Sequence, residues 1–564
     1  MITEDNVSQL GLLIEAGATL EAINGSGIFN TDYLKIDGKL DLQDESQLIQ
    51  TTLSELAITS AGLLEKDQQG KADLFSYNYW SSPVGVTNTL SNNNAYTISA
   101  VLRDGTIASS PSNITYTTDY DGAPTSPITL SNFWMFTYEN ETDDYSSWHQ
   151  VFETGILKAG QGYTMKGTGA GSTVNTQNYT FIGKPHNGNI SHDIDEKNIS
   201  LLGNPYPSAL DADQFILDNE GTQDGIITGA LYFWEHFNTN NSHYLDQYEG
   251  GYATYNLAGS TVAIPSSIVS DNGLPTFLPQ RYIPVGQGFF VQGKAGGTIS
   301  FNNAQRKFVK ESDLGSIFTF TGIAPTEASS VPVSAPNPEI DRLYFRAKIP
   351  EGPERQLLLA VKADKTTGID YGYDAKMIEN NPTDIAWDIE EMPFTIQTVG
   401  ALTAALELPL MIRSDINGMM TFGIETLQGI PADLPIYFLD KATYSYTDLR
   451  SSDASFYIGQ EEEYLNRYFI VFEAPLLSVA DTIATADALE VYFSNDTLFI
   501  QNEVFFDAKN ITLYNTLGQV VFQTEKTYDN VLRIALPLQV SRQIYLVCFR
   551  YNDRIPIAKK IVID

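Results

Sequence analysis

The chain has 564 residues, of which 42% are hydrophobic and 12% aromatic, and a formal net charge of −36. This length exceeds the roughly 200 to 250 residues that one hydrophobic core supports, and the apolar content excludes a disordered acidic chain. The acidic excess argues against nucleic acids and anionic membranes as partners, and the single Cys548 excludes an internal disulfide framework.

Short alternating apolar and polar runs, separated by Gly and Asn-Gly turns, dominate the sequence, whereas amphipathic helical patterns are almost absent. The sequence therefore predicts an all-β protein. No run of about 18 apolar residues occurs, so we expect no transmembrane segment. The first residues lack the basic and apolar regions of a signal peptide, which we expect upstream of this chain.

Residues 1–70 contain short strands that are interrupted by glycine, as at Gly11, Gly17, Gly25 and Gly38. This spacing predicts β-solenoid-like rungs. The pattern begins at full strength close to the first residue, without a polar capping segment, so we expect these rungs to be a truncated part of a longer protein.

Residues 75–318 contain an internal duplication. The sequence GQGYTMKGTGAG at 160–171 is repeated as GQGFFVQGKAGG at 286–297, and four glycines match at an offset of 126 residues. Asn78 and Asn204 have the same offset. These matches predict two copies of one β module, at about 75–175 and 200–310.

The Phe-Trp pair at Phe133 is also repeated, at Phe233, although its offset is only 100 residues. The shorter offset predicts loops of different length around this strand in the two copies.

A stretch rich in Pro, Ser, Ala and Thr at 322–338 reads as a linker, and residues 340–474 then predict one β-sandwich. A second linker at about 475–489 precedes a small Ig-like β-sandwich of about seven strands at 488–564. That last segment holds eight acidic and eight basic residues, so the rest of the chain carries the entire −36.

The glycine clusters at Gly160 and Gly286 superficially resemble phosphate-binding loops. Such loops precede a helix, whereas strand-forming residues follow these glycines, so tight turns are the favoured interpretation. No serine nucleophile motif, zinc-protease motif or phosphate-binding loop is present. The sequence therefore predicts no catalytic site.

All five histidines fall in one region of the chain and none has the helical spacing of a metal site, so core or surface roles are favoured. They are His149, His186, His192, His236 and His243.

Acidic pairs at Asp119–Asp121 and Asp211–Asp213 fit ordinary turns. We expect no cofactor, with Ca²⁺ as the alternative ligand of these pairs. Tryptophans such as Trp80, Trp134, Trp148 and Trp234 fit a β-sheet core better than sugar-stacking platforms.

The last segment resembles the C-terminal sorting domain of the type IX secretion system of Bacteroidota. The resemblance lies in ITLYNTLGQVV at 511–521, IYLV at 544–547 and AKKIVID at 558–564. Two segments depart from the family pattern: FSND at 493–496 replaces a Pro-Asn-Pro, and RQI at 542–544 lacks the usual glycine.

This resemblance implies the residues of the sorting signal, which are Leu517, Gly518, Gln519, Tyr545, Lys559 and Lys560. It also implies the secretion translocon and its sorting machinery as partners, removal of the tail near 475–489, and an extracellular or outer-membrane-surface location. Surface glycans or lipopolysaccharide are the further partners that it suggests.

Three upstream blocks are similar to large flavobacterial surface proteins that are mostly of unknown function. The blocks are YNYWSSP at 77–83, LGNPYPS at 202–208 and VGQGFF at 285–290.

The sequence thus predicts a non-catalytic, adhesin-like surface protein. The alternative is a polysaccharide-binding or polysaccharide-degrading enzyme with its catalytic part in the duplicated module or upstream. That alternative requires a groove lined by Trp80, Trp134 or Trp234 and two carboxylates about 5 to 10 Å apart.

Overall fold

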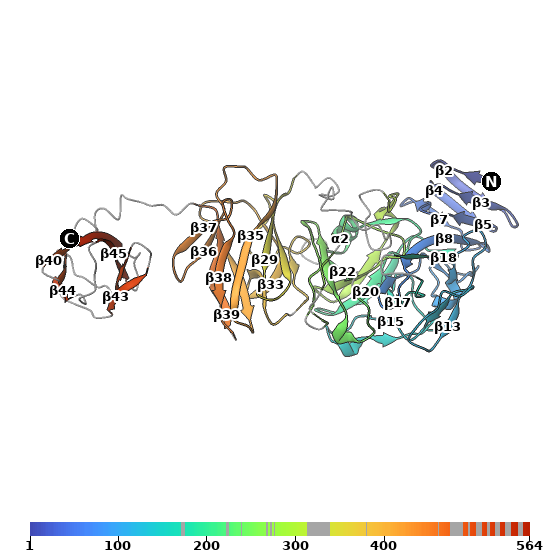
Figure 1. Ribbon diagram of the computed structural model, residues 1–564. Coiled ribbons are helices and arrows are strands. Elements are labelled where there is room, and N and C mark those ends of the chain that lie inside the picture. Colours follow the sequence, from blue (N-terminus) through green and yellow to red (C-terminus); the bar gives the residue numbers. More distant parts are fainter. Residues whose placement is uncertain are drawn as a thin grey trace. The chain divides into compact units, whose positions relative to one another are not determined.

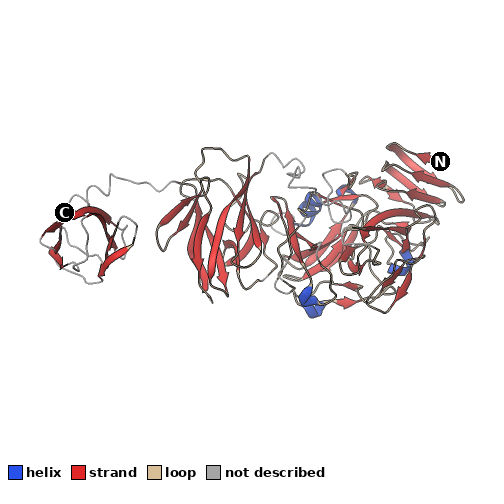
Figure 2. Ribbon diagram, in the orientation of Figure 1, coloured by secondary structure: helices blue, strands red, loops and turns tan. Residues whose placement is uncertain are grey.

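The computed structural model describes most of residues 1–473 and the strands of the C-terminal part. The described ranges are 1–170, 175–220, 225–237, 240–266, 269–270, 273–275, 277–312, 339–379, 381–460, 462–473, 489–494, 497–502, 510–515, 519–524, 531–535, 543–550 and 557–563. The chain divides into two compact units, Met1–Ala474 and Pro475–Asp564. Strands dominate both, which confirms the all-β prediction (Figures 1 and 2).

The N-terminal residues form about three turns of a β-solenoid-like arrangement, as predicted. One parallel sheet consists of β2 (Val7–Ile14), β4 (Gly27–Ile36), β6 (Gln47–Gln50) and β7 (Glu55–Leu56). The other begins with β1 (Ile2–Thr3), β3 (Thr19–Ala22), β5 (Lys39–Leu42) and β8 (Leu63–Lys71). Leu20, Leu40 and Leu64 stand in register and are buried, so a ladder of leucines joins the rungs.

Strand β8 ends the parallel stack and pairs antiparallel with β18 (Thr176–Pro185), which extends the rung sheet into the following module. The other strands of this sheet are β10 (Val84–Gly85), β11 (Leu102–Asp104) and β12 (Ser112–Asn113). The rungs and the module therefore share one continuous sheet.

The duplicated region consists of several small sheets. Its pairs are β9 (Tyr77–Trp80) with β17 (Tyr163–Lys166), β13 (Thr115–Thr117) with β14 (Thr129–Ser131), β15 (Phe136–Thr137) with β16 (His149–Gln150), and β19 (Ile190–Ile194) with β27 (Gly297–Phe301). A five-stranded sheet contains β20 (Ile199–Gly203), β26 (Gly288–Gly293), β22 (Ile227–His236), β23 (Gly250–Asn256) and β24 (Gly259–Thr261). A three-stranded sheet contains β25 (Tyr282–Ile283), β21 (Ala209–Asp211) and β28 (Arg306–Lys307).

The two glycine motifs form turns, as expected, and each turn bonds to the other half of the duplicated region. Gly160 and Gly286 have φ values of 81° and 73°. The amide of Ser81 donates to the carbonyl oxygen of Gly286 (2.6 Å). The amide of Gly203 donates to the carbonyl oxygen of Gly160 (3.0 Å). The contact is thus reciprocal, like that of an isologous interface.

The register of these strands differs from the sequence alignment. Trp80 pairs with Tyr163, and Leu202 pairs with Phe289, which lies 126 residues after Tyr163. Leu202 lies only 122 residues after Trp80, so the offset of 126 that matched Asn78 with Asn204 is wrong for the first strand. The cause is local: Asn78 bonds to the backbone of Lys71, whereas the side chain of Asn204 organises its own turn.

Helices are short and few in the described part of the chain: α1 (Ile98–Val101), α2 (Ala212–Glu220), and the 3₁₀ turns η1 (Tyr145–Ser147), η2 (Leu245–Gln247) and η3 (Asn303–Gln305). Helix α2 was not expected from the sequence, although its buried face has helical spacing, with Ala212, Phe215, Ile216 and Asn219. None of these helices is long and apolar enough to cross a membrane.

Residues 341–471 form one 11-stranded sheet that folds around its own core, which fits the predicted sandwich (Figure 1). Its strands are β29 (Asp341–Lys348), β30 (Glu354–Val361), β31 (Ala375–Lys376), β32 (Asp384–Ile389), β33 (Met392–Val399), β34 (Glu407–Ser414), β35 (Gly418–Gln428), β36 (Tyr437–Asp440), β37 (Ser445–Asp448), β38 (Ala454–Ile458) and β39 (Glu462–Val471). Most of the two expected linkers, at 322–338 and 475–489, lies outside the described residues.

The sandwich packs closely against β22 of the duplicated region. The amide of Gly372 donates to the carbonyl oxygen of Thr228 (2.9 Å). The carbonyl oxygen of Gly372 accepts from the amide of Leu257 (2.9 Å). A Cβ atom on Gly229 would lie 2.4 Å from the Cα atom of Gly372. Only glycine therefore allows the two backbones to approach this closely.

The described residues of the second unit form seven strands in two sheets. One sheet has β40 (Leu489–Ser494), β41 (Thr497–Asn502) and β44 (Val531–Ala535), and the other has β43 (Val520–Thr524), β42 (Asn510–Tyr514), β45 (Gln543–Arg550) and β46 (Ile557–Ile563). Leu498 and Ile500 of the first sheet share a core with Val547 and Phe549 of the second. This arrangement is a small β-sandwich.

The close approach at Gly229 predicts a large cost for a single methyl group. Gly229 and Gly188 both have a positive φ, 87° and 70°, but the space around a Cβ atom on Gly188 is open. Gly188→Ala should cost about 1 kcal/mol through backbone strain alone. Gly229→Ala should cost about 1 to 3 kcal/mol more, because it also overpacks the contact with Gly372.

Thermal unfolding of the two variants, followed by calorimetry, checks this difference. Equal melting temperatures for the two variants would contradict the close backbone contact.

Candidate functional site

The most unusual polar group of the duplicated region is the ammonium group of Lys166, at the end of β17. Its Nζ atom lies 3.8 Å from the ring centre of Trp134, 4.6 Å from that of Tyr77 and 4.7 Å from that of Tyr248. We call Tyr77, Trp134 and Tyr248 the aromatic box. Because the box takes residues from both copies, it exists only when the two copies are joined.

A chain of hydrogen bonds leads from Lys166 to the surface. Nζ donates to the hydroxyl of Tyr248 (2.8 Å) and lies 3.1 Å from Nδ1 of His243, whose Nε2 lies 2.7 Å from Oδ1 of Asp121. An ammonium group only donates, so a neutral His243 accepts at Nδ1 and donates from Nε2 to the carboxylate. The His243 ring also stacks on Trp134, with centroids 4.9 Å apart and planes at 15°.

Burial controls the protonation of this chain. It lowers the pKa of Lys166 to about 7, although the charges of Asp73 and Asp121 oppose the shift. Burial also lowers the pKa of His243, which the hydrogen bond to Asp121 opposes and the charge of Lys166 reinforces. Both groups therefore lose protons more readily than they do in water.

The other histidines have core or surface roles, as expected. His186, His192 and His236 are buried. Burial lowers the pKa of all three, to about 4 for His186. His149 is exposed, and its Nε2 atom lies 3.1 Å from the carboxylate of Glu141.

The tryptophans belong to packed clusters. Trp80 is fully buried in the core that the rungs share with the first copy. Trp134 is covered by Lys166 and His243. Trp148 and Trp234 are partly buried against a separate cluster that contains Phe290. Trp80 and Trp134 are thus packed side chains, which is the role that the sequence favoured.

The acidic pair at Asp211 and Asp213 binds a cation of the chain itself. Arg281 donates from Nε and Nη2 to the two carboxylate oxygens of Asp211, each at 2.8 Å. Its Nε atom also lies 3.2 Å from Asp213. Within the described residues, no group of three or more His, Cys, Asp or Glu side chains is arranged to hold a metal ion.

The sorting residues implied by the resemblance lie in the second unit, except that Leu517 and Gly518 fall outside the described residues. Gln519 closes the hairpin of β42 and β43: its amide donates to Oδ1 of Asn515 (2.9 Å), and its carbonyl oxygen accepts from the Asn515 amide (3.0 Å). Tyr545 is buried in β45.

The strand register brings the hairpin and the two lysines to the same sheet. Tyr514 of β42 pairs with Leu546 of β45, which in turn pairs with Lys560 of β46. Lys559 pairs with Val547, one position along. Tyr514, which precedes the Gln519 turn, is therefore about two strand spacings, roughly 10 Å, from Lys560.

Comparison with known proteins places most of the chain in one family. A family model described as "Domain of unknown function (DUF8693)" matches residues 96–472. The chain belongs to the DUF8693 family. No curated protein sequence matches it.

Two solved structures show only weak similarity. The crystal structure of Dpr11 IG1 bound to DIP-gamma IG+IG2 is 6% identical, covers 26% of this chain and 90% of that chain, and gives a TM-score of 0.10. The BSP domain of a biofilm associated protein is 10% identical, covers 88% of this chain and 97% of that chain, and gives a TM-score of 0.11.

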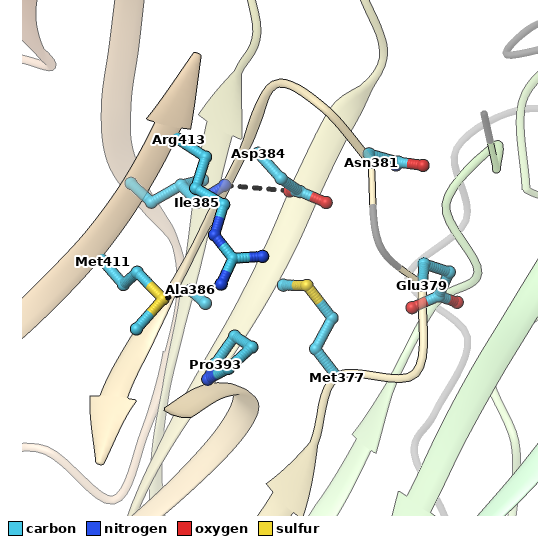
Figure 3. Close-up of a pocket in the computed structure, with 9 residues that line it drawn as sticks. All are labelled: Met377, Glu379, Asn381, Asp384, Ile385, Ala386, Pro393, Met411 and Arg413. Carbon is cyan, nitrogen blue, oxygen red and sulfur yellow. Dashed lines mark hydrogen bonds between the residues drawn. The ribbon is translucent and has the colours of Figure 1, made fainter. Parts of the chain in front are cut away.

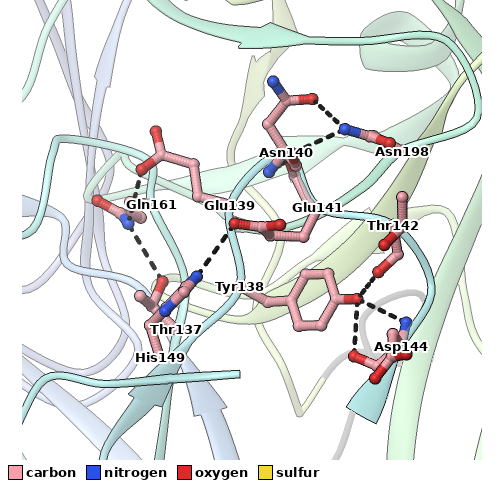
Figure 4. Close-up of polar contacts among 11 residues, drawn as sticks. Thr137, Tyr138, Glu139, Asn140, Glu141, Thr142, Asp144, His149, Gln161 and Asn198 are labelled. Atoms are coloured by element: carbon pink, nitrogen blue, oxygen red, sulfur yellow. Dashed lines mark hydrogen bonds and ion pairs between the residues drawn. The ribbon is translucent and has the colours of Figure 1, made fainter. Parts of the chain in front are cut away.

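The DUF8693 region contains a polar network that ties the two copies together (Figure 4). Nδ2 of Asn198 donates to the carbonyl oxygen (2.8 Å) and Oδ1 (3.1 Å) of Asn140, and the amide of Leu201 donates to the carbonyl oxygen of Tyr138 (2.7 Å). On the first copy, Nε2 of Gln161 donates to Thr137 (3.2 Å), as Figure 4 shows. This network holds Tyr138 and Asn140 of the first copy against Asn198 and Leu201.

The sandwich of the DUF8693 region has a small pocket (Figure 3). Its lining residues include Met377, Met411, Pro393, Glu379 and Arg413. It has space for about one water molecule. A second cavity of the same size lies at the junction of the copies, beside Lys71, Tyr79, Trp234 and His236.

Sequence reasoning missed Lys166 and the aromatic box. The available signal was a lysine at the end of a short strand, Tyr163 to Lys166, in which every residue is buried. Its partners lie about 30 to 90 residues away along the chain, so periodicity could not connect them.

The buried histidines predict acid sensitivity of the folded state. His186 has a pKa of about 4 when folded and about 6.5 when unfolded, so below pH 6.5 the unfolded chain binds the proton more readily. The neutral form of His186 therefore contributes fully to the stability of the fold above pH 6.5, and this contribution decreases as the pH drops below that value. Between pH 7 and pH 5, protonation of His186 alone should lower the free energy of unfolding by about 2 kcal/mol.

Urea unfolding of the full chain at both pH values measures this loss. His186→Gln should reduce the loss by about 2 kcal/mol. If His186→Gln loses as much free energy of unfolding between pH 7 and pH 5 as the wild type, His186 is not the source of the acid sensitivity.

Proposed function

We propose that the protein is a secreted or cell-surface, non-catalytic, adhesin-like protein of a Bacteroidota bacterium. The type IX secretion system would export it by means of the C-terminal residues 488–564. The observation that carries this proposal is the second unit, which is compact in itself. Its four-stranded sheet carries Lys559 and Lys560 on β46, and Gln519 closes the hairpin of β42 and β43 in the same sheet.

The charge distribution supports the same function. The C-terminal segment is neutral, whereas the rest of the chain carries the −36 charge. A strongly acidic body remains soluble and resists non-specific association in the salt outside a cell. Extended β architecture, with rungs, a duplicated module and a sandwich in one compact unit, suits a rigid surface protein.

A second candidate is the polysaccharide-binding or polysaccharide-degrading alternative. It is favoured by the exposed ring of Tyr120, which packs on Phe133 and lies beside His243, the hydrogen-bond partner of Asp121. Release of reducing ends from a polysaccharide by the purified chain would separate degradation from binding.

Removal of residues 490–564 should leave the protein in the periplasm of its host. Protease digestion of intact cells and immunoblotting of cell fractions measure the location. Since a truncated chain can misfold, a reporter with a signal peptide fused to residues 475–564 provides the complementary test. This fusion should reach the surface or the medium, whereas the reporter alone should not. Surface delivery of the truncated chain contradicts the proposed role.

A further inference from the structure

A second group of rings lies outside the aromatic box, where the chain between β13 and β14 reaches the surface. The Tyr120 ring contacts Phe133 edge-on, with centroids 4.7 Å apart, and Trp134 at 5.6 Å, and yet Tyr120 is 58% exposed. A tyrosine that contacts two rings but remains more than half exposed presents part of its apolar surface to solvent. We call Tyr120 and Phe133 the surface rings.

The surface rings are fixed by the backbone and by the aromatic box below them. Nε1 of Trp134 donates to the carbonyl oxygen of Tyr120 (2.7 Å), and Oγ of Ser131 donates to that of Asp119 (2.5 Å). Lys166 and His243 both pack on the ring of Trp134 and contact each other there. The rings are therefore preorganised, so a ligand would bind without first ordering this loop.

Two carboxylates belong to the residues on either side of Tyr120 in the sequence. Asp121 accepts a hydrogen bond from His243 at Oδ1, and its side chain is 62% exposed. Asp119 accepts from Oγ1 of Thr117 (3.1 Å) and is also exposed. Each ionised carboxylate has two oxygens and several acceptor positions, so both retain capacity for further donors.

We propose that Tyr120, Phe133, Asp119 and Asp121 form a binding site for a neutral polysaccharide. The apolar face of a sugar ring packs on Tyr120, and sugar hydroxyls donate to the two carboxylates. This ligand class deepens the proposed adhesin-like function and rests on it.

The charge of the site selects among sugars. Asp119 and Asp121 belong to the part of the chain that carries the net charge of −36. A polysaccharide with carboxylate or sulfate groups would place like charges side by side, which weakens binding. A neutral chain has no such cost and supplies the hydroxyl donors that the two carboxylates accept.

Affinity electrophoresis of the full chain, in gels that contain a soluble polysaccharide, tests the proposal. The probes are laminarin, xyloglucan and mannan as neutral chains and alginate as an acidic chain. At least one neutral probe should retard the protein, and alginate should not. Retardation by alginate alone, or by none of the four probes, overturns the proposal.

A matched pair of variants locates the site. Tyr120→Ala should weaken binding at least fivefold, whereas Tyr457→Ala, which removes an equally exposed tyrosine (58%) from the sandwich, should leave it unchanged. Unchanged binding in Tyr120→Ala, with a melting temperature equal to that of the wild type, overturns the site.

Whether the Tyr120→Ala variant reaches the cell surface distinguishes this inference from the export proposal. If the variant reaches the cell surface but no longer binds, the site is supported irrespective of the sorting test. If the wild-type chain binds a neutral probe but is not exported through its C-terminal segment, only the export proposal fails. If it is exported and binds none of the probes, only the binding site fails.

Discussion

Two backbone hydrogen bonds, exchanged between the halves of the duplicated region, determine how the rest of that region is assembled. Ser81 donates to Gly286, and Gly203 donates to Gly160. Both acceptors belong to turns with a positive φ, which glycine adopts at the lowest cost. The turn of each copy is therefore tied to the edge of the other copy.

This exchange explains why the aromatic box can exist. It sets β9 and β17 of the first copy beside the sheet of the second copy, where Tyr248 approaches Lys166. A buried ammonium group without acceptors would cost several kcal/mol. Here the three rings, a hydroxyl and an imidazole nitrogen provide the acceptors, and all of them are fixed by the joined copies.

Several other buried cations are stabilised in the same manner, by neutral oxygen atoms. Lys184 donates to the carbonyl oxygens of Ile58 (2.7 Å), Asn88 (2.7 Å) and Ser91 (3.0 Å). Arg306 donates to that of Leu48 (2.6 Å), which ties the end of the second copy to the solenoid rungs. Because these cations do not neutralise carboxylates, the acidic excess of the chain remains available at its surface.

The features that follow from local sequence could be predicted, whereas those that depend on distant contacts could not. The rungs followed from glycine spacing, and the turns at Gly160 and Gly286 followed from the strand residues after them. Helix α2 was missed because only its first residues were considered, as the acidic pair Asp211–Asp213, which was interpreted as a turn. The strand offset was misassigned because Asn78 and Asn204 are identical residues with different bonding roles.

The same limit applied to the candidate sites. Trp134 was considered as a sugar platform, but the structure places it beneath Lys166 and His243, and Tyr120 lies further out. The buried tryptophan thus supports the exposed tyrosine. A single sequence carries no signal for this division of roles, because it depends on a lysine 32 residues later and a histidine from the other copy.

The acidic surface and the exposed ring together give a physical basis for selectivity. Stacking on Tyr120 depends on dispersion and apolar area, so salt affects it little. Repulsion of a polyanion by Asp119 and Asp121 acts over about 8 Å at physiological salt. The two carboxylates adjoin the ring, so they lie within that range of any sugar stacked on it. Repulsion therefore persists in the salt outside a cell, and a charge pattern that disfavours most polyanions still leaves neutral chains able to bind.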